Sequence, residues 1–508
     1  MTLRRHSVLS SRRAGILLHP TSLPGPFGIG DLGPSALRFL FWLRDAGQSV
    51  WQLLPLGPTG LGNSPYGALS GLAGNPLLIS PDWLEWNDLL EPEEVTACHF
   101  HGAVDYARAG ALKDRLLRQA HGRWLKLDRQ DSRRLRVERA MEEQGPWLEE
   151  WCLFAALKDS LGGRSWLEWD GALRDRDPTA LADARQRLAE EISFHRTCQG
   201  FFALQWNRLR RVAKSLGITL FGDLPIYPAL DSVEVWANPR LFDLDEKGRP
   251  RAISGVPPDD FSDDGQLWGS PIYRWERLAE EGYRWWTERV EGALRRVDLL
   301  RLDHFRGFEA YWAVPADADS AAEGEWRPGP GRALFEALAA DLGHLPLVAE
   351  DLGVITPEVE ELRDSLGLPG MRVLQFAFDE PESVHLPHAA PKRSVAYTGT
   401  HDNDTSEGWF ASLPAERQRT VQTYLRTEGG EPIAWAMLRA IYASPARLAI
   451  APFQDLLELG SEARINTPGK GSGNWSWRLA GLYPWREASG PRLRALTESA
   501  GRLAAFGG

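Results

Sequence analysis

The amino-acid sequence predicts an α/β protein built around one closed (β/α)8 barrel. Two observations support this fold class. Eight short apolar, β-branched segments each end in polar or Gly/Pro residues, and helical patterns separate several of them. Buried strands that alternate with helices predict a parallel sheet, and eight such strands favour a barrel. An open, doubly wound sheet is the alternative architecture.

The expected elements can be placed in chain order. The apolar segments predict strands at residues 15–18, 50–56, 218–224, 297–302, 345–349, 371–378, 394–397 and 446–453. Apolar residues recurring with a helical period predict helices at 282–296, 332–342, 357–366 and 415–425. Residues 1–508 are therefore expected to form a single (β/α)8 barrel unit with insertions.

Two segments interrupt the barrel pattern. Residues from about 80 to 212 are rich in Leu, Arg, Glu and Trp and carry apolar faces, which predicts an inserted helical subdomain. Residues from about 225 to 281 predict an inserted loop-rich region over the active site. Within it, residues 255–269 combine prolines, acids and aromatics, which is typical of an ordered functional loop.

Polar residues follow most of the expected strands. A (β/α)8 barrel carries its chemistry at the C-terminal ends of its strands. The residues at these positions are His19, Asp223, Asp303, Glu350, Asp351, His401, Asp402, Asn403, Asp404, Gln454 and Asp455. Carboxylates gathered at one end of a barrel repel one another, so their repetition favours a function over chance surface acids.

Arg301 and Asp303 define the central strand of this prediction. Residues two apart on a strand face the same side, so the arginine lies beside the aspartate. A neighbouring arginine favours an ionised carboxylate, which is the form that a nucleophile requires. A structural salt bridge at the strand end is the alternative interpretation.

Glu350 and Asp402 are the other candidate catalytic acids. Glu350 follows an apolar strand that could desolvate it and raise its pKa towards that of a proton donor. Two carboxyl groups with separated pKa values are what glycoside cleavage requires, and their spacing distinguishes retention from inversion. The sequence therefore favours chemistry on a sugar.

Composition narrows the range of partners. The net charge of −11 argues against a nucleic-acid partner, and the 22 Trp offer flat faces suited to sugar rings as well as to a core. Three widely spaced cysteines form no metal or disulfide motif, which predicts a cytoplasmic protein. No apolar segment is long enough for a membrane span, no nucleotide-binding motif is present, and no cofactor or metal is expected.

Seven motifs carry a resemblance to a known family. They are LLHPTSLPG (17–25), LPLGPTG (54–60), NSPY (63–66), GDLPI (222–226), RLDHFRG (301–307), AEDLG (349–353) and GTHDNDT (399–405). With these motifs the chain resembles the amylomaltases, the 4-alpha-glucanotransferase or disproportionating enzyme family, over nearly its whole length. The resemblance implies a TIM barrel with helical insertions and no separate C-terminal β-sandwich domain.

The resemblance also implies roles for individual residues. Asp303 matches the nucleophile, Glu350 the general acid/base, and Asp402 the acid that holds the hydroxyls of the sugar and stabilises the transition state. Residues that match positions supporting these acids or near the bound glucan are Arg301, His401, Asp223, Tyr66, Ser64, Asp259, Gln266, Trp268, Phe376 and Asn466.

The implied activity is transfer of an α-1,4-glucan segment to the 4-hydroxyl of an acceptor glucan or glucose, through a covalent glycosyl-enzyme. The expected partners are α-1,4-glucans and maltooligosaccharides. Two alternatives are an amylase-like hydrolase and a non-catalytic glucan-binding barrel. The presence of all three candidate acids argues against the non-catalytic barrel.

Overall fold

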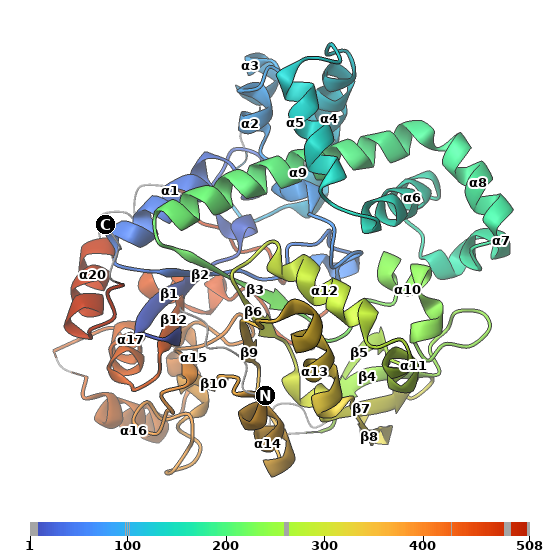
Figure 1. The fold of residues 1–508 in the computed structure, drawn as a ribbon. Helices are drawn as coiled ribbons and strands as arrows, with labels where there is room; N and C mark the ends of the chain where they lie inside the picture. Colours follow the sequence, from blue (N-terminus) through green and yellow to red (C-terminus); the bar gives the residue numbers. More distant parts are fainter. Residues whose placement is uncertain are drawn as a thin grey trace.

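A parallel sheet of eight strands forms the centre of the computed structural model (Figure 1). The structure describes residues 9–96, 98, 100, 102–258, 264–427, 429–481 and 489–504. The strands are β1 (Arg13–Leu17), β2 (Val50–Gln52), β3 (Thr219–Leu224), β6 (Leu299–Leu302), β9 (Leu347–Ala349), β10 (Gly370–Val373), β11 (Ser394–Tyr397) and β12 (Leu448–Pro452). All eight predicted strands are thereby confirmed.

Several strands are shorter than the apolar segments that predicted them. The segment 50–56 forms a strand only as far as Gln52, and Pro55 and Pro58 follow it with no backbone N–H to offer a neighbouring strand. The segment 371–378 leaves the sheet after Val373 and continues as the 3-10 helix η10 (Leu374–Phe376). Apolar character therefore marked burial correctly but overestimated strand length.

The sheet closes into a barrel between β9 and β10. The order of paired strands is β10-β11-β12-β1-β2-β3-β6-β9. Across the remaining seam, the Ala349 backbone N–H donates to the Pro369 carbonyl at 2.9 Å. Asp351 reinforces the seam, because its carboxylate accepts from the Met371 backbone N–H at 2.6 Å and from Arg372 Nη1 at 3.1 Å. This closure brings the C-terminal ends of all the strands into one ring.

Apolar side chains fill the barrel on both faces of the strands. Inside the barrel, Phe221, Leu299, Val348 and Met371 are fully buried in one cluster. A larger cluster fills the space between the strands and the surrounding helices. Strands buried on both faces explain why the sequence shows continuous apolar runs rather than alternation.

Helices surround the barrel. They are α1 (Pro34–Asp45), α12 (Arg284–Leu294), α13 (Gly331–Leu342), α14 (Pro357–Leu366), α15 (Ser406–Ser412), α16 (Ala415–Leu425), α17 (Ile433–Ala443), α18 (Phe453–Leu456) and α20 (Gly490–Ser499) (Figure 1). The four predicted helices correspond to α12, α13, α14 and α16. Among the described residues, none of the helices is both long and apolar enough to traverse a lipid bilayer.

Residues 81–215 are mainly helical. The helices are α2 (Pro81–Glu85), α3 (Pro92–Thr96), α4 (Tyr106–Leu125), α5 (Ser132–Glu142), α6 (Trp147–Ser160), α7 (Gly171–Arg174), α8 (Pro178–Arg187) and α9 (Ala189–Ser215). In Figure 1 the long helix α9 crosses above the barrel strands. A buried ion pair of 2.7 Å between Lys113 of α4 and Asp31 ties these helices to the segment that follows β1.

A second sheet of four antiparallel strands lies beside the barrel and was not predicted. Its order is β5 (Gln266–Pro271), β4 (Ala252–Val256), β7 (Ala310–Pro315) and β8 (Glu325–Pro328). The first two strands, with α10 (Val233–Ala237) and α11 (Trp275–Glu280), fall inside the segment 225–281 that the sequence marked as rich in loops. These strands contain Gly, Ser and Pro, and only pairing with β7 reveals them.

Candidate active site

Arg301 lies at the centre of a cluster of acids at the C-terminal ends of the strands. It belongs to β6, and its Nη1 atom lies 2.8 Å from Asp303 Oδ1 and 2.7 Å from Asp223 Oδ2. Asp223 belongs to β3, which pairs directly with β6 and places Asp223 opposite Arg301. The strand register therefore holds one guanidinium between two carboxylates.

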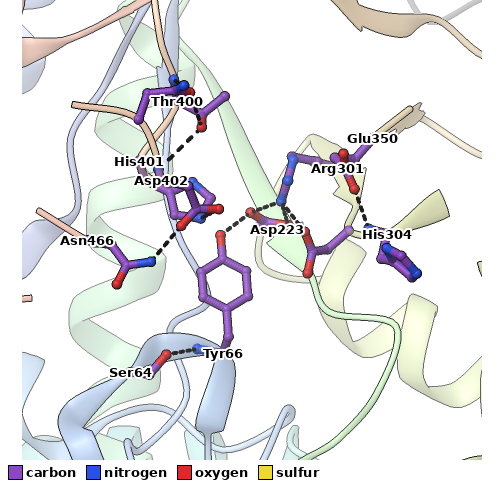
Figure 2. A network of polar contacts seen from close by, with 12 residues as sticks. Ser64, Tyr66, Asp223, Arg301, His304, Glu350, Thr400, His401, Asp402 and Asn466 are labelled. Carbon is purple, nitrogen blue, oxygen red and sulfur yellow. Dashed lines mark hydrogen bonds and ion pairs between the residues drawn. The ribbon is translucent and has the colours of Figure 1, made fainter. Parts of the chain in front are cut away.

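Tyr66 closes this cluster from the segment after β2. Its hydroxyl donates to Asp223 Oδ2 at 2.7 Å (Figure 2), and its backbone N–H donates to Ser64 Oγ at 3.2 Å. Burial raises the pKa of Tyr66 well above its usual value, so the hydroxyl stays a donor. Its ring stacks on His401 at 5.0 Å. Ser64 thus fixes the turn that orients the Tyr66 ring.

Asp402 reaches the site from the segment after β11. His401 Nε2 lies 3.3 Å from Asp402 Oδ2, and Asn466 Nδ2 donates to Asp402 Oδ1 at 2.6 Å. Burial lowers the pKa of His401, so the ring is neutral at neutral pH. The Asp402 side chain remains 45% exposed. It is therefore held in place by two neighbours and open to a ligand.

Glu350 lies on the other side of the Arg301 cluster from Asn466, directly after β9 (Figure 2). Its Oε2 atom accepts from the backbone N–H of His304 at 2.7 Å, and its Oε1 atom accepts from that of Leu352 at 3.0 Å. His304 has a left-handed backbone with φ 52°. Two backbone donors therefore fix the orientation of the Glu350 carboxyl.

Burial shifts the pKa values of the two facing acids. It raises the pKa of Glu350 to about 7, against the opposing effects of Arg301 and the two backbone donors. It also raises the pKa of Asp303, against Arg301, and the neighbouring carboxylates add to the rise. The Asp303 side chain is partly exposed and contacts Arg301, whereas Glu350 is buried. The direct contact with Arg301 therefore distinguishes Asp303 from Glu350.

Trp268 and Gln266 of β5 lie next to the Glu350 side of the site. The Trp268 ring meets His304 edge-on at 4.7 Å, and its Nε1 donates to Gln266 Oε1 at 3.2 Å. Phe376 is different, because it packs against His385 at 5.7 Å and against the barrel interior. The predicted site residue Asp259 lies outside the described residues.

Two residues of the site were not singled out from the sequence. His304 supplies the backbone donor to Glu350, and Trp475 places its buried ring 6.0 Å from Tyr66 and 6.2 Å from His401. His304 follows the predicted nucleophile directly, and its position in that motif was a usable signal. Trp475 carried no comparable signal, because the packing that brings it to the site involves residues far away in the sequence.

Some acids at the strand ends have structural roles. Asp351 is 4% exposed and pairs with Arg363 at 2.5 Å as well as with Arg372. Asp455 is 2% exposed and accepts from Thr398 Oγ1 at 2.6 Å and from the backbone and side chain of Ser406. These two carboxylates lie after barrel strands and are buried among polar partners. Their place in the sequence does not by itself distinguish a catalytic carboxylate from a structural one.

A group suited to a metal ion occurs away from this cluster. Among the residues that the structure describes, Asp159, Glu191 and His195 of α6 and α9 bring their ligand atoms within 4.8 Å of one another. Arg118 already occupies the group, since its Nη2 atom lies 3.0 Å from Glu191 and 3.9 Å from Asp159. A guanidinium in that position satisfies the acids without an ion.

The arrangement is suited to acid-assisted displacement at a sugar carbon. One carboxylate beside a guanidinium can attack, and a second carboxyl with a raised pKa can donate a proton to the leaving oxygen. A third carboxylate, Asp402, is positioned to accept hydrogen bonds from sugar hydroxyls.

Comparisons with known proteins agree with this chemistry. A family model described as 4-alpha-glucanotransferase matches residues 18–483. The chain is 48% identical to a 4-alpha-glucanotransferase of Thermus thermophilus, over 97% of this chain and 99% of that protein. It is 44% identical to a chloroplastic/amyloplastic 4-alpha-glucanotransferase of Arabidopsis thaliana, over 97% and 86%. The structure of an amylomaltase from Streptococcus agalactiae in complex with acarbose superposes with a TM-score of 0.93 at 38% identity, covering 97% of this chain and 100% of the other.

Proposed function

The chain belongs to the 4-alpha-glucanotransferase family, and from this premise we propose that Asp303, Glu350 and Asp402 carry its reaction. The protein is a 4-alpha-glucanotransferase with a glucan substrate. It transfers a segment of an α-1,4-glucan to the 4-hydroxyl of an acceptor, with retention of the anomeric configuration. The donor and acceptor are maltooligosaccharides or longer glucans.

Asp303 is the nucleophile of the proposed mechanism. Its carboxylate attacks the anomeric carbon while the bond to the leaving glycosidic oxygen breaks. Arg301, 2.8 Å away, favours the negative form of Asp303 and fixes the orientation of its carboxylate. Asp223 in turn holds Arg301 in position by accepting a hydrogen bond from Arg301 Nη1. Asp223 is itself fixed by a hydrogen bond from the Tyr66 hydroxyl.

Glu350 is the general acid and then the general base. It gives its proton to the leaving oxygen in the first step, and in the second it takes a proton from the acceptor hydroxyl that attacks the glycosyl-enzyme. The observation that carries this assignment is the difference in contacts: Arg301 lies 2.8 Å from Asp303, whereas the Glu350 carboxyl accepts from two backbone N–H groups and has a pKa raised to about 7. That asymmetry gives each acid one role.

Asp402 holds the donor sugar. Its two oxygens are oriented by His401 and Asn466, and the side chain stays accessible to hydroxyl groups. Hydrogen bonds to these hydroxyls that strengthen as the ring flattens stabilise the transition state. Trp268, placed against His304 beside Glu350, supplies a face on which an acceptor sugar can rest.

The proposal also covers the two inserted segments and the location of the protein. The segment 225–281 forms one wall of the substrate cleft, since Trp268 lies on it, and residues 80–212 form a helical subdomain. A cytoplasmic location fits the buried, unpaired thiols of Cys98, Cys152 and Cys198.

Incubation with maltotriose tests the function. A transferase converts maltotriose into glucose and a ladder of longer maltooligosaccharides, while the number of reducing ends stays constant. A hydrolase only shortens the substrate and raises the number of reducing ends. A non-catalytic glucan-binding barrel leaves maltotriose unchanged. Either of the last two results would contradict the assignment.

A further inference from the structure

Several exposed apolar side chains lie on or near the antiparallel sheet. Ten large apolar side chains are exposed among the described residues. Four of them, Leu267, Trp268, Trp326 and Val354, lie on the antiparallel sheet or on the segment after β9. Because isolated exposed apolar residues need no explanation whereas clustered ones mark interaction sites, this side of the molecule is a candidate binding surface.

The strand register aligns part of this cluster in one row. Trp326 of β8 pairs with Trp312 of β7, Trp312 pairs with Gly255 of β4, and Gly255 pairs with Leu267 of β5. Directly opposed residues of antiparallel strands share a face of the sheet. Gly255 has no side chain, so the row consists of two tryptophans and a leucine with a gap between them.

The Trp326 ring is held firmly although it is exposed. The Arg306 guanidinium lies 3.8 Å from the centre of the ring, and the Trp312 ring packs against it at 5.0 Å and 65°. Trp326 nevertheless keeps 40% of its surface exposed. A ring fixed by two neighbours loses little conformational entropy when a ligand covers the rest of it.

Arg306 links this surface to the segment that carries the candidate active site. Arg306 belongs to the 3-10 helix η8 (Phe305–Phe308), which directly follows His304, the backbone donor to Glu350. Arg306 Nη1 also donates to the Val354 carbonyl at 2.5 Å. Val354 follows Glu350 by four residues, so their Cα atoms are at most about 14 Å apart.

We propose that Trp312, Trp326 and Val354, together with Leu267, form a remote α-glucan-binding surface, termed the Trp326 face. It binds a segment of glucan that continues past Glu350, away from the Asp402 side of the site. Tryptophan faces pack against the apolar faces of sugar rings, and a neutral glucan needs no counter-charge there. The identity of the ligand rests on the proposed function.

The test compares long and short substrates in the Trp326→Ala enzyme. With amylose as the donor, KM is expected to rise about two- to tenfold, from the range of aromatic contact energies. With maltotriose, kcat and KM are expected to change less than twofold, because a short chain does not reach the Trp326 face. Trp326→Phe, which keeps an aromatic ring, is expected to retain most of the affinity for amylose.

Trp86→Ala is the matched control. Trp86 is 53% exposed and has Arg208 over its ring at 5.5 Å, but it lies at the end of α2, among the helices of residues 81–215. Equal amylose KM values for Trp326→Ala and Trp86→Ala would overturn the proposal. A loss of amylose affinity in Trp326→Phe as large as that in Trp326→Ala would also overturn it. A change in the solution mass of Trp326→Ala with no change in amylose KM would overturn it too, and would identify an interface between copies of the chain. Maltotriose turnover by the wild-type enzyme tests the proposed function separately.

Discussion

Replacement of Glu350 by glutamine separates the two steps of the proposed reaction. The amide has nearly the same shape as the carboxyl, but it cannot donate a proton to the leaving oxygen or remove one from the acceptor. We expect Glu350→Gln to lower the rate of maltotriose disproportionation by about 10²- to 10⁴-fold, which is the usual contribution of general acid/base catalysis.

The structure indicates how much the environment of Glu350 contributes. With its pKa raised to about 7, the carboxyl is about 90% protonated at pH 6. A glutamate with the ordinary pKa of 4.5 would be only about 3% protonated at that pH. Burial therefore raises the concentration of the competent acid by about 30-fold. The rate of the first step in the wild-type enzyme should accordingly fall as pH rises through about 7, because Glu350 then loses its proton.

The decisive assay uses α-maltosyl fluoride as the donor. Fluoride leaves without protonation, so Asp303 can form the glycosyl-enzyme even when residue 350 is glutamine. The intermediate then accumulates, because the acceptor hydroxyl has no base. We expect Glu350→Gln to release a burst of fluoride equal to the number of active sites, followed by slow turnover, and the burst rate should no longer fall above pH 7.

The matched control is Asp303→Asn in the same assay. It lacks the attacking carboxylate and is expected to release no burst of fluoride. The absence of a burst from correctly folded Glu350→Gln, or a burst from Asp303→Asn, would refute the assignment of the two acids.

Three further predictions follow from individual contacts. Asn466→Ala removes the 2.6 Å hydrogen bond to Asp402 and should lower kcat/KM for maltotriose by about tenfold, because a hydrogen bond to a charged group contributes about 1.5 kcal/mol or more. An unchanged kcat/KM would exclude Asn466 as a positioning residue. Asp351→Asn leaves two buried arginines without a full counter-charge and should lower the free energy of unfolding by about 3 kcal/mol. The measurement is the denaturant concentration at the midpoint of unfolding, and equal midpoints for variant and wild type would contradict the prediction. Dialysis against a chelator should leave the transfer rate unchanged, and a loss that calcium restores would contradict the absence of a metal requirement.

The sequence predicted the central barrel well because burial on both faces leaves a local signal. Each of the eight strands contains a continuous apolar run, and each run is visible without knowing its partners. The antiparallel sheet escaped prediction for the opposite reason. Its strands include Gly255, Gly269 and Pro328, and their extended shape depends on pairing between segments as far apart as 252–256 and 310–315.

The candidate site was predictable to the extent that its residues follow strands. Asp223, Asp303 and Glu350 follow or end buried strands, and barrel closure necessarily gathers such positions at one end. The same rule also selected Asp351 and Asp455, which are buried and fully occupied by structural partners. Local sequence cannot separate these cases, because it does not show which groups fill the space around a carboxylate.

By itself, therefore, the sequence determined the parallel barrel, its strand order along the chain, and the type of chemistry at the strand ends. The tertiary structure alone decided which acid contacts the arginine. Arg301 forms ion pairs with Asp303 and Asp223, whereas Glu350 accepts from two backbone N–H groups, and burial raises the pKa of Glu350 to about 7. These charges and the exclusion of water depend on distances between strands that are remote in the sequence, and only the closed barrel sets those distances.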